Sequence, residues 1–220
     1  KVTVYVELKA RFDQKANLQW ASDMTKAGIQ IIYSIPKLKV HAKLALIIRK
    51  KGSKPGDQVY LGTGNFNEKT ARLYGDHGLF TSHKGIVKEV KHLYKYLEDQ
   101  NFKCSFKHIL VPGFNMVNTF ENLIRQEIKH VKKGKNGHMI LKMNGLQDPY
   151  LVSKLYEASE AGVKIDLIVR GICILKPNQA YSKNIRVIRI VDRFLEHARV
   201  FVFHNNGENN TYLGSADWMK

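Results

Sequence analysis

The sequence predicts an α/β protein with two repeated halves, each containing a mixed, largely parallel sheet flanked by helices. Strand-like and helix-like segments alternate along the 220 residues, which is typical of parallel strands joined by helical crossovers. A histidine-containing hairpin motif occurs once in each half. A helix-to-strand junction also repeats, as A-G-I-Q-I-I and then A-G-V-K-I-D. These observations predict a duplicated domain whose halves are related by a pseudo-twofold axis.

The first half is expected to begin with a strand, a helix and a second strand. Asp13 is a suitable N-cap for the helix, and Gly28 follows its expected last residue, Lys26, as glycine often does at helix ends. A hairpin around the polar loop K-K-G-S-K-P-G-D and a closing helix come next. The expected strands are 2–8, 29–33, 41–49 and 58–61, and the expected helices are 13–26 and about 85–97.

The second half repeats this order after the polar stretch E-D-Q-N-F-K-C-S, which marks the expected domain boundary. The two domains are therefore expected at 1–104 and 105–220. The expected strands are 108–111, 138–143, 163–169 and 185–190, the expected helices are 115–132 and 149–160, and the second motif hairpin closes the half.

The two copies of the motif read H-A-K-L-A-L-I-I from His41 and H-A-R-V-F-V-F-H from His197. Each is followed by a strand, V-Y-L-G-T-G-N-F or T-Y-L-G-S-A-D-W. Alternate side chains of a strand share one face, so His41 is expected beside Lys43 and His197 beside Arg199. The repetition predicts two half-sites that face each other around one phosphoryl group.

These residue types suit phosphoryl transfer. A neutral histidine can attack phosphorus and form a phosphoramidate, while Lys43 and Arg199 would neutralise the phosphoryl oxygens. The second histidine could donate a proton to the leaving oxygen or stabilise it. The G-T-G-N and G-S-A-D turns offer N–H groups and a hydroxyl for phosphate contact. A polar strand residue is the simpler interpretation of one His-x-Lys, but it does not explain two copies with matching turns.

The composition points to a polyanionic partner. Lys and Arg number 36 against 19 Asp and Glu, giving a formal net charge of +17, which favours nucleic acid, acidic lipid or a chain of phosphates. A solvated lysine surface is the alternative. Cys104 and Cys173 lack the spacing of a metal site, so reduced cytosolic thiols are expected. No apolar run approaches the roughly 20 residues that span a bilayer, and no signal peptide is recognised.

Together these motifs resemble the bacterial polyphosphate kinase family, within the phospholipase D superfamily. The resemblance implies two tandem phospholipase-D-like domains that form the catalytic C-terminal half of a longer enzyme. The start at Lys1 and the end at Lys220 favour the same interpretation. The matching segments are L-K-A-R-F-D (8–13), H-A-K-L-A-L-I (41–47), G-T-G-N-F-N-E-K-T-A-R-L-Y (62–74), D-L-I-V-R-G-I-C (166–173), F-L-E-H-A-R (194–199) and S-A-D-W-M (215–219).

The resemblance also assigns roles to single residues. His41 matches the histidine that becomes phosphorylated, and His197 and Arg170 match residues that contact the nucleotide phosphates. Tyr74 matches a nucleotide-binding tyrosine, for which a buried aromatic residue is the alternative. Arg11 matches a position associated with the magnesium–phosphate region. Because a guanidinium has no lone pair for a metal, Arg11 is interpreted as a phosphate clamp beside the ion. Each arginine ends an apolar strand, where α/β sites open.

The reaction implied is reversible transfer of the terminal phosphoryl group of ATP to polyphosphate through a phosphohistidine at His41. Mg²⁺ is the implied cofactor, and ATP, ADP and polyphosphate are the implied ligands. We expect a homo-oligomer for the full-length enzyme, and a cytoplasmic location with peripheral membrane association as a further option. Nucleic acid is not the expected partner.

Three alternatives remain open from the sequence. A phosphodiesterase or nuclease of the same superfamily would use the same histidines with water as acceptor. The phospholipase D pattern, however, has an aspartate seven residues after each histidine, where this chain has Ile48 and His204. A nucleic-acid-binding module would explain the charge but not the duplicated site. A structural fragment, inactive alone, is the third.

A catalytic imidazole needs a partner on its second nitrogen. Asp76 lies fourteen residues after Gly62, and we expect it to orient His197 across the pseudo-twofold. The equivalent place after Gly214 would fall beyond Lys220, so His41 is expected to lack its carboxylate here. An ordinary surface carboxylate is the alternative for Asp76.

Overall fold

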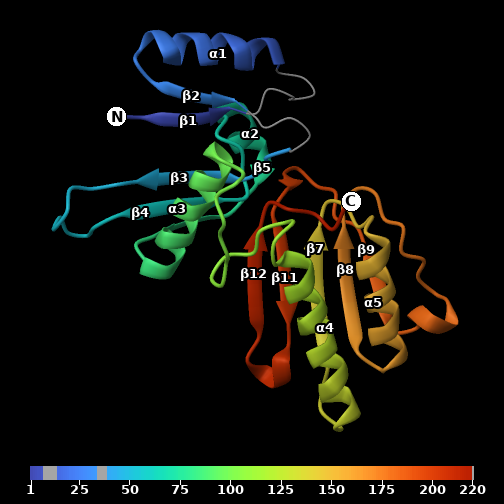
Figure 1. Ribbon diagram of the computed structural model, residues 1–220. Helices are drawn as coiled ribbons and strands as arrows, with labels where there is room; N and C mark the ends of the chain where they lie inside the picture. Colours follow the sequence, from blue (N-terminus) through green and yellow to red (C-terminus); the bar gives the residue numbers. More distant parts are fainter. Residues whose placement is uncertain (7–13, 34–38, 220) are drawn as a thin grey trace. The chain divides into compact units, whose positions relative to one another are not determined.

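The computed structural model describes residues 1–6, 14–33 and 39–219. It is a mixed α/β structure with several sheets, labelled in Figure 1. The chain divides into two compact units, residues 1–41 with 91–104 and residues 42–90 with 105–220. The predicted N-cap Asp13 and the predicted phosphate clamp Arg11 lie outside the described residues. No described helix is both long and apolar enough to cross a membrane.

The first unit contains a strand–helix–strand element. Strand β1 (Thr3–Val6) pairs in parallel with β2 (Gln30–Tyr33), and α1 (Gln14–Lys26) connects them. Gly28 adopts a φ of 80°, a conformation that glycine allows without a steric cost. Its N–H donates to the Thr25 carbonyl at 2.9 Å and ends the helix. The expected strand–helix–strand order is confirmed.

The second unit contains a five-stranded sheet in the order β12-β11-β7-β8-β9 (Figure 1). Strands β7, β8 and β9 run parallel, whereas β11 is antiparallel to both β7 and β12. The sheet is therefore mixed, as predicted. Its strands are β7 (His138–Met143), β8 (Lys164–Val169), β9 (Ile185–Ile188), β11 (Arg199–Phe203) and β12 (Asn210–Gly214).

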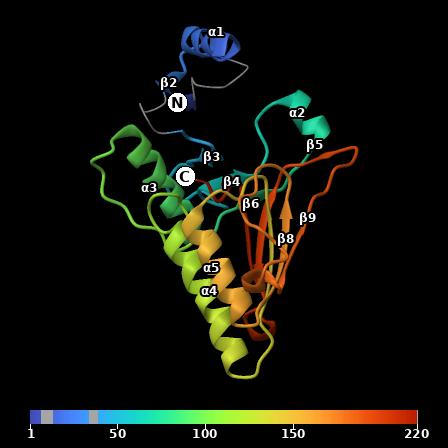
Figure 2. The ribbon, with the colours of Figure 1, turned by 90° about the vertical axis from the view of Figure 1, so that its right-hand side faces the viewer.

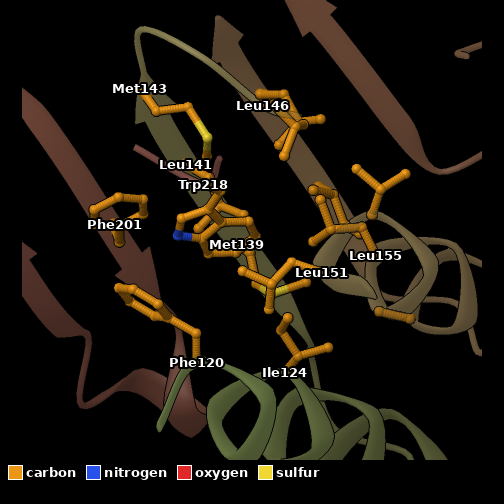
Figure 3. Packing of buried hydrophobic residues seen from close by; sticks show 14 of the residues in the cluster. Phe120, Ile124, Met139, Leu141, Met143, Leu146, Leu151, Leu155, Phe201 and Trp218 are labelled. Atoms are coloured by element: carbon orange, nitrogen blue, oxygen red, sulfur yellow. The ribbon is translucent and has the colours of Figure 1, made fainter. Parts of the chain in front are cut away.

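Helices α4 (Met116–Lys132) and α5 (Pro149–Glu160) lie side by side along this sheet (Figure 2). Asp148 caps α5 through the N–H groups of Tyr150 and Leu151. Figure 3 shows the apolar core, in which the Trp218 ring stacks on Phe201 with 5.7 Å between the ring centroids. Two short 3₁₀ helices, η1 (Ala180–Ser182) and η2 (Asn205–Gly207), lie in the connections.

The first motif hairpin lies in a separate antiparallel sheet, β3-β4-β6, and this differs from the largely parallel sheet expected for the first half. The antiparallel hairpin accounts for the difference, because its third strand β6 also pairs antiparallel with β4. The remaining elements of the chain are β3 (Lys43–Ile47), β4 (Gln58–Gly62), α2 (Glu68–Leu73), β5 (Tyr74–Gly75), β6 (Gly78–Thr81), α3 (Lys84–Glu98) and β10 (Leu195–Glu196). Strands β5 and β10 form a sheet of their own.

The two motif hairpins have the same strand register. In the first, Lys43 lies opposite Gly62, and in the second, Arg199 lies opposite Gly214. Each hairpin has five residue pairs counted from there, ending at Ile47 in β3 and at Phe203 in β11. The expectation that the motif is repeated as a hairpin is confirmed.

The predicted strand 108–111 is wrong, because this segment is irregular. The buried carboxylate of Glu89 accepts hydrogen bonds from the backbone N–H groups of Lys107, His108 and Ile109 at 2.8 to 3.1 Å. A carboxylate therefore satisfies donors that a strand would have given to a neighbouring strand.

Candidate functional site

Two short strands bring the expected carboxylate to His197. Strands β5 and β10 pair in parallel, and the carbonyl of Gly75 accepts the N–H groups of His197 and Ala198 at 3.3 and 3.2 Å. The next residue, Asp76, then faces the imidazole. Its Oδ1 lies 2.8 Å from the Nδ1 of His197, so the contact expected between these two residues is present.

Thr63 holds the Asp76 carboxylate in place. The Thr63 hydroxyl donates to Asp76 Oδ1 at 2.6 Å and accepts the N–H of His77 at 2.9 Å. Thr63 is buried, so its hydroxyl fixes Asp76, whereas the sequence suggested a phosphate contact. A Cβ at Gly64 would lie 2.6 Å from Asp76 Oδ2, and only glycine leaves room for the carboxylate.

Electrostatics favour a neutral His197 against an ionised Asp76. Burial lowers the pKa of His197 below its ordinary value, and the charges of Arg199 and Lys43 lower this pKa further against the opposing effect of Asp76. Burial acts to raise the pKa of Asp76, but hydrogen bonds from Thr63 and His197 outweigh it and lower the pKa. An ionised carboxylate only accepts hydrogen bonds, so the Nδ1 of His197 carries the proton and Nε2 carries the lone pair.

Tyr74 lies against the same imidazole. The Tyr74 ring centroid is 5.0 Å from that of His197, with the planes inclined at 49°. Tyr74 also follows α2, whose N-cap Asn67 accepts the N–H groups of Lys69 and Thr70. The end of helix α2 therefore positions Tyr74 and, two residues later, Asp76 beside His197.

The two motif cations lie in different surroundings. The Lys43 side chain is buried and its charge acts on His197. Arg199 is also buried and forms a bidentate pair with Asp217, at 3.1 Å from Nε and 2.8 Å from Nη2. Its Nη1 donates to the backbone carbonyl of His197 at 2.7 Å. Arg199 is thus bound to protein groups through all three nitrogens.

Arg170 directly follows strand β8, as the sequence predicted. Its Nε donates to Asn144 Oδ1 at 3.1 Å. The N–H of Gly171 donates to the Asn144 carbonyl at 2.7 Å, and a Cβ at Gly171 would lie 2.7 Å from that same oxygen. Glycine therefore allows the close approach that places Arg170 beside Asn144.

Lys43, Tyr74, Asp76, His197 and Arg199 thus lie in the second compact unit and form one neighbourhood. His41 belongs to the first unit and is exposed, so its expected approach to His197 stays a prediction.

The donor groups that the structure describes do not form a magnesium cage. Among the described residues, no group of three or more His, Cys, Asp or Glu side chains could hold a metal ion. Asp76 is engaged by Thr63 and His197, and Asp217 by Arg199. Magnesium is commonly held by substrate phosphates and water with few protein ligands.

Three contributing residues were missed in the sequence: Thr63, Asn144 and Asp217. Thr63 and Asp217 lie inside quoted motifs, but spacing does not reveal that each holds another side chain. Asn144 directly follows a strand, which is the one signal that could have singled it out.

Two family models together match most of the chain. "Polyphosphate kinase C-terminal domain 1" matches residues 1–103 and "Polyphosphate kinase C-terminal domain 2" matches residues 109–220. Polyphosphate kinases of Bacillus anthracis, Yersinia pestis and Escherichia coli are 47%, 49% and 46% identical over 220 residues. These alignments cover 100% of this chain but 31%, 32% and 32% of those proteins.

A crystal structure of polyphosphate kinase from Porphyromonas gingivalis matches with a TM-score of 0.88 and 51% identity, over 100% of this chain and 36% of that one. The chain therefore spans about a third of the length of these relatives. With both C-terminal family models matched, the chain belongs to the polyphosphate kinase family.

Proposed function

We propose that the full-length protein transfers the terminal phosphoryl group of ATP reversibly to inorganic polyphosphate through a phosphohistidine at His41. Family membership supports the reaction. The observation that carries it within this chain is the 2.8 Å hydrogen bond between Asp76 and His197, beside the Tyr74 ring. The net charge of +17 suits a substrate with about one negative charge per phosphate.

The proposed first step forms a nitrogen–phosphorus bond. An imidazole nitrogen of His41 attacks the γ-phosphorus of ATP, the bond to the β-phosphate oxygen breaks, and ADP leaves. In the second step a terminal oxygen of polyphosphate attacks the same phosphorus, and the nitrogen–phosphorus bond breaks. His197, oriented by Asp76, would contact the transferring phosphates through Nε2. Lys43 and Arg170 would neutralise charge, as would Arg11.

The finer architecture belongs to the same proposal. We infer two tandem phospholipase-D-like domains, 1–104 and 105–220, related by a pseudo-twofold axis. The equal register of the two motif hairpins supports the duplication. The homo-oligomeric state and the peripheral membrane association stay predictions.

A phosphodiesterase or nuclease is the less favoured alternative. The relatives named above are polyphosphate kinases, and Ile48 and His204 occupy the positions of the two missing aspartates. His204 follows β11, and its N–H donates to the His138 carbonyl at 2.9 Å.

The test is covalent labelling of the full-length protein with ATP that is radioactive in its γ-phosphate. The expected result is an acid-labile protein label that polyphosphate or ADP discharges. His41→Ala should remove the label, because His41 is the proposed acceptor of the phosphoryl group. Equal labelling of the wild type and His41→Ala would contradict the proposal, and so would steady hydrolysis of a phosphodiester without labelling.

A further inference from the structure

The two motif copies differ in the cation and in the residue that closes the motif. The first copy has Lys43 and Asn65, where the second has Arg199 and Asp217 at the equivalent positions. The first copy thus combines a lysine with a neutral amide, and the second copy combines an arginine with a carboxylate. The second copy can therefore form an ion pair that this pair of residues cannot form in the first.

The Arg199–Asp217 pair is bidentate, with Arg199 buried and Asp217 partly buried. Arg199 is 4% exposed and donates to Asp217 from Nε and Nη2. Two parallel hydrogen bonds of this kind fix the relative orientation of both planar groups. The third bond, from Nη1 to the His197 carbonyl, attaches the pair to the backbone of the histidine itself.

Asp217 continues this connection to the end of strand β7. Its Oδ1 also accepts the backbone N–H groups of Asn144 and Gly145 at 2.7 and 3.1 Å. Burial acts to raise the pKa of Asp217, but Arg199 and these N–H groups lower it, so the carboxylate is ionised. The next residue, Trp218, is buried in the core, and its backbone N–H donates to the Gly145 carbonyl at 3.2 Å.

Asn144 then reaches Arg170. The backbone of Asn144 is held by Asp217, while its side-chain oxygen accepts the Nε–H of Arg170. The terminal nitrogens of Arg170 carry further N–H donors that match two phosphate oxygens. One continuous set of hydrogen bonds therefore runs from the His197 backbone to the Arg170 guanidinium.

We propose that Asp217 and Asn144 are positioning residues that hold Arg170 at a fixed place relative to His197. This inference rests on the proposed function, in which Arg170 and His197 both contact nucleotide phosphates. Under this proposal Arg199 connects His197 to Asp217 and has a structural role, and Lys43 is the motif cation that contacts phosphate. Groups fixed in advance lose little freedom when the nucleotide binds.

The test is a double-mutant cycle on nucleotide affinity in the full-length protein. The dissociation constant of the β,γ-imido analogue of ATP is measured by calorimetry for the wild type, Asn144→Ala, Arg170→Ala and the double variant. Asn144→Ala should weaken binding roughly tenfold. In the Arg170→Ala background the same change should have almost no effect, because Asn144 acts through Arg170. Arg199→Lys should show the same dependence on Arg170.

Asn184→Ala is the matched control. Asn184 donates from its side chain to the Ser159 carbonyl at 2.7 Å. It lies just before the start of β9, whereas Arg170 lies just after the end of the parallel strand β8, so the two residues are at opposite edges of the sheet. This control should lower the thermal transition without changing the dissociation constant. Should Asn144→Ala fail to fold, Gly171→Ala disturbs the same contact, since its Cβ would meet the Asn144 carbonyl.

Wild-type affinity in Asn144→Ala would overturn the inference, and so would equal weakening with and without Arg170. Equal weakening by Arg199→Lys in both backgrounds would instead make Arg199 a direct phosphate ligand. A wild-type protein that neither binds the analogue nor becomes labelled by ATP would contradict the proposed function itself, which is a separate outcome.

Discussion

The carboxylate of Asp76 lies 2.8 Å from the Nδ1 of His197, although 121 residues separate the two in sequence. The first residue follows the first copy of the motif, and the second begins the other copy. Each half of the chain therefore contributes one member of the pair, as one expects if a duplicated domain builds a single site from both halves.

Replacing Asp76 by Asn should impair His197 without unfolding the protein. The carboxylate acts to raise the pKa of His197, so its loss should lower that pKa further. The amide also no longer fixes the Nδ1–H tautomer, and turnover should fall on the order of a hundredfold or more. Histidine NMR titration and phosphotransfer rates in the full-length protein provide the measurements.

Asp166→Asn is the control for this variant. It removes another carboxylate that contacts a histidine, since Asp166 Oδ2 lies 2.8 Å from His138 Nε2. Its turnover should stay near that of the wild type. A rise in the pKa of His197 in Asp76→Asn would contradict the assignment of the pair.

Replacing Lys43 by Met should shift the pKa of His197 upward. Burial lowers this pKa first, and the Lys43 charge lowers it further, so removing the charge relieves part of the shift. At a fixed pH near 6, a larger fraction of His197 should then be protonated. The same NMR titration measures it, and an unchanged or lower pKa would show that Lys43 does not act on this histidine.

Replacing Glu127 by Gln should destabilise the second unit. Glu127 is fully buried, and its two oxygens accept the backbone N–H groups of His138 and Asn205 at 3.1 and 2.6 Å. An amide can accept only one of them, and the orphaned donor costs about 1–3 kcal/mol. Scanning calorimetry should show a lower transition temperature. The exposed pair Lys154–Glu157 gives the control, because Glu157→Gln should cost less than about 1 kcal/mol.

Acid should weaken the Arg199–Asp217 pair. The folded pKa of Asp217 lies below its ordinary value of 3.8, so the unfolded chain binds more protons once the pH falls below that value. The stabilising contribution is therefore present above pH 3.8 and is lost as the pH falls through the folded pKa. In Asp217→Asn the transition temperature should be lower at pH 7 and should fall less steeply in acid. A parallel fall in both proteins would contradict this.

Elements with local signals could be predicted from the sequence. Helix α5 begins and ends at the predicted residues because Asp148 caps it and Pro149 starts it. The contact between Asp76 and His197 was also foreseen, since the repeat indicated where a partner should lie. The irregular segment 108–111 was not predicted, because a short apolar run resembles a strand. Its backbone N–H groups instead bind Glu89, which lies 19 residues before His108.

The role of Asp217 could not be predicted from the sequence, for a different reason. Its equivalent in the first copy is Asn65, and the repeat therefore suggested two similar turns. Only the fold shows that Arg199 is buried against Asp217 and that Asn144 connects this pair to Arg170. Hydrogen bonds between residues 73 positions apart leave no trace in local spacing.

Replacing Gly64 by Ala should displace Asp76 while the hairpin remains folded. The added Cβ would lie 2.6 Å from Asp76 Oδ2 and 2.8 Å from its Cγ, so the carboxylate must move away from His197. The second copy has Ala216 at the equivalent position, which shows that this turn does not itself require glycine. Turnover should therefore fall by a factor similar to that in Asp76→Asn.

The double variant Gly64→Ala with Asp76→Ala separates this explanation from general misfolding. Once the carboxylate is gone, the Cβ at position 64 no longer meets it, so the double variant should lose no more turnover than Asp76→Ala alone. Such non-additivity is expected for groups in contact and not for distant, independent sites. If the two losses multiply instead, the alanine damages the turn in some other way, and the glycine is not there to make room for Asp76.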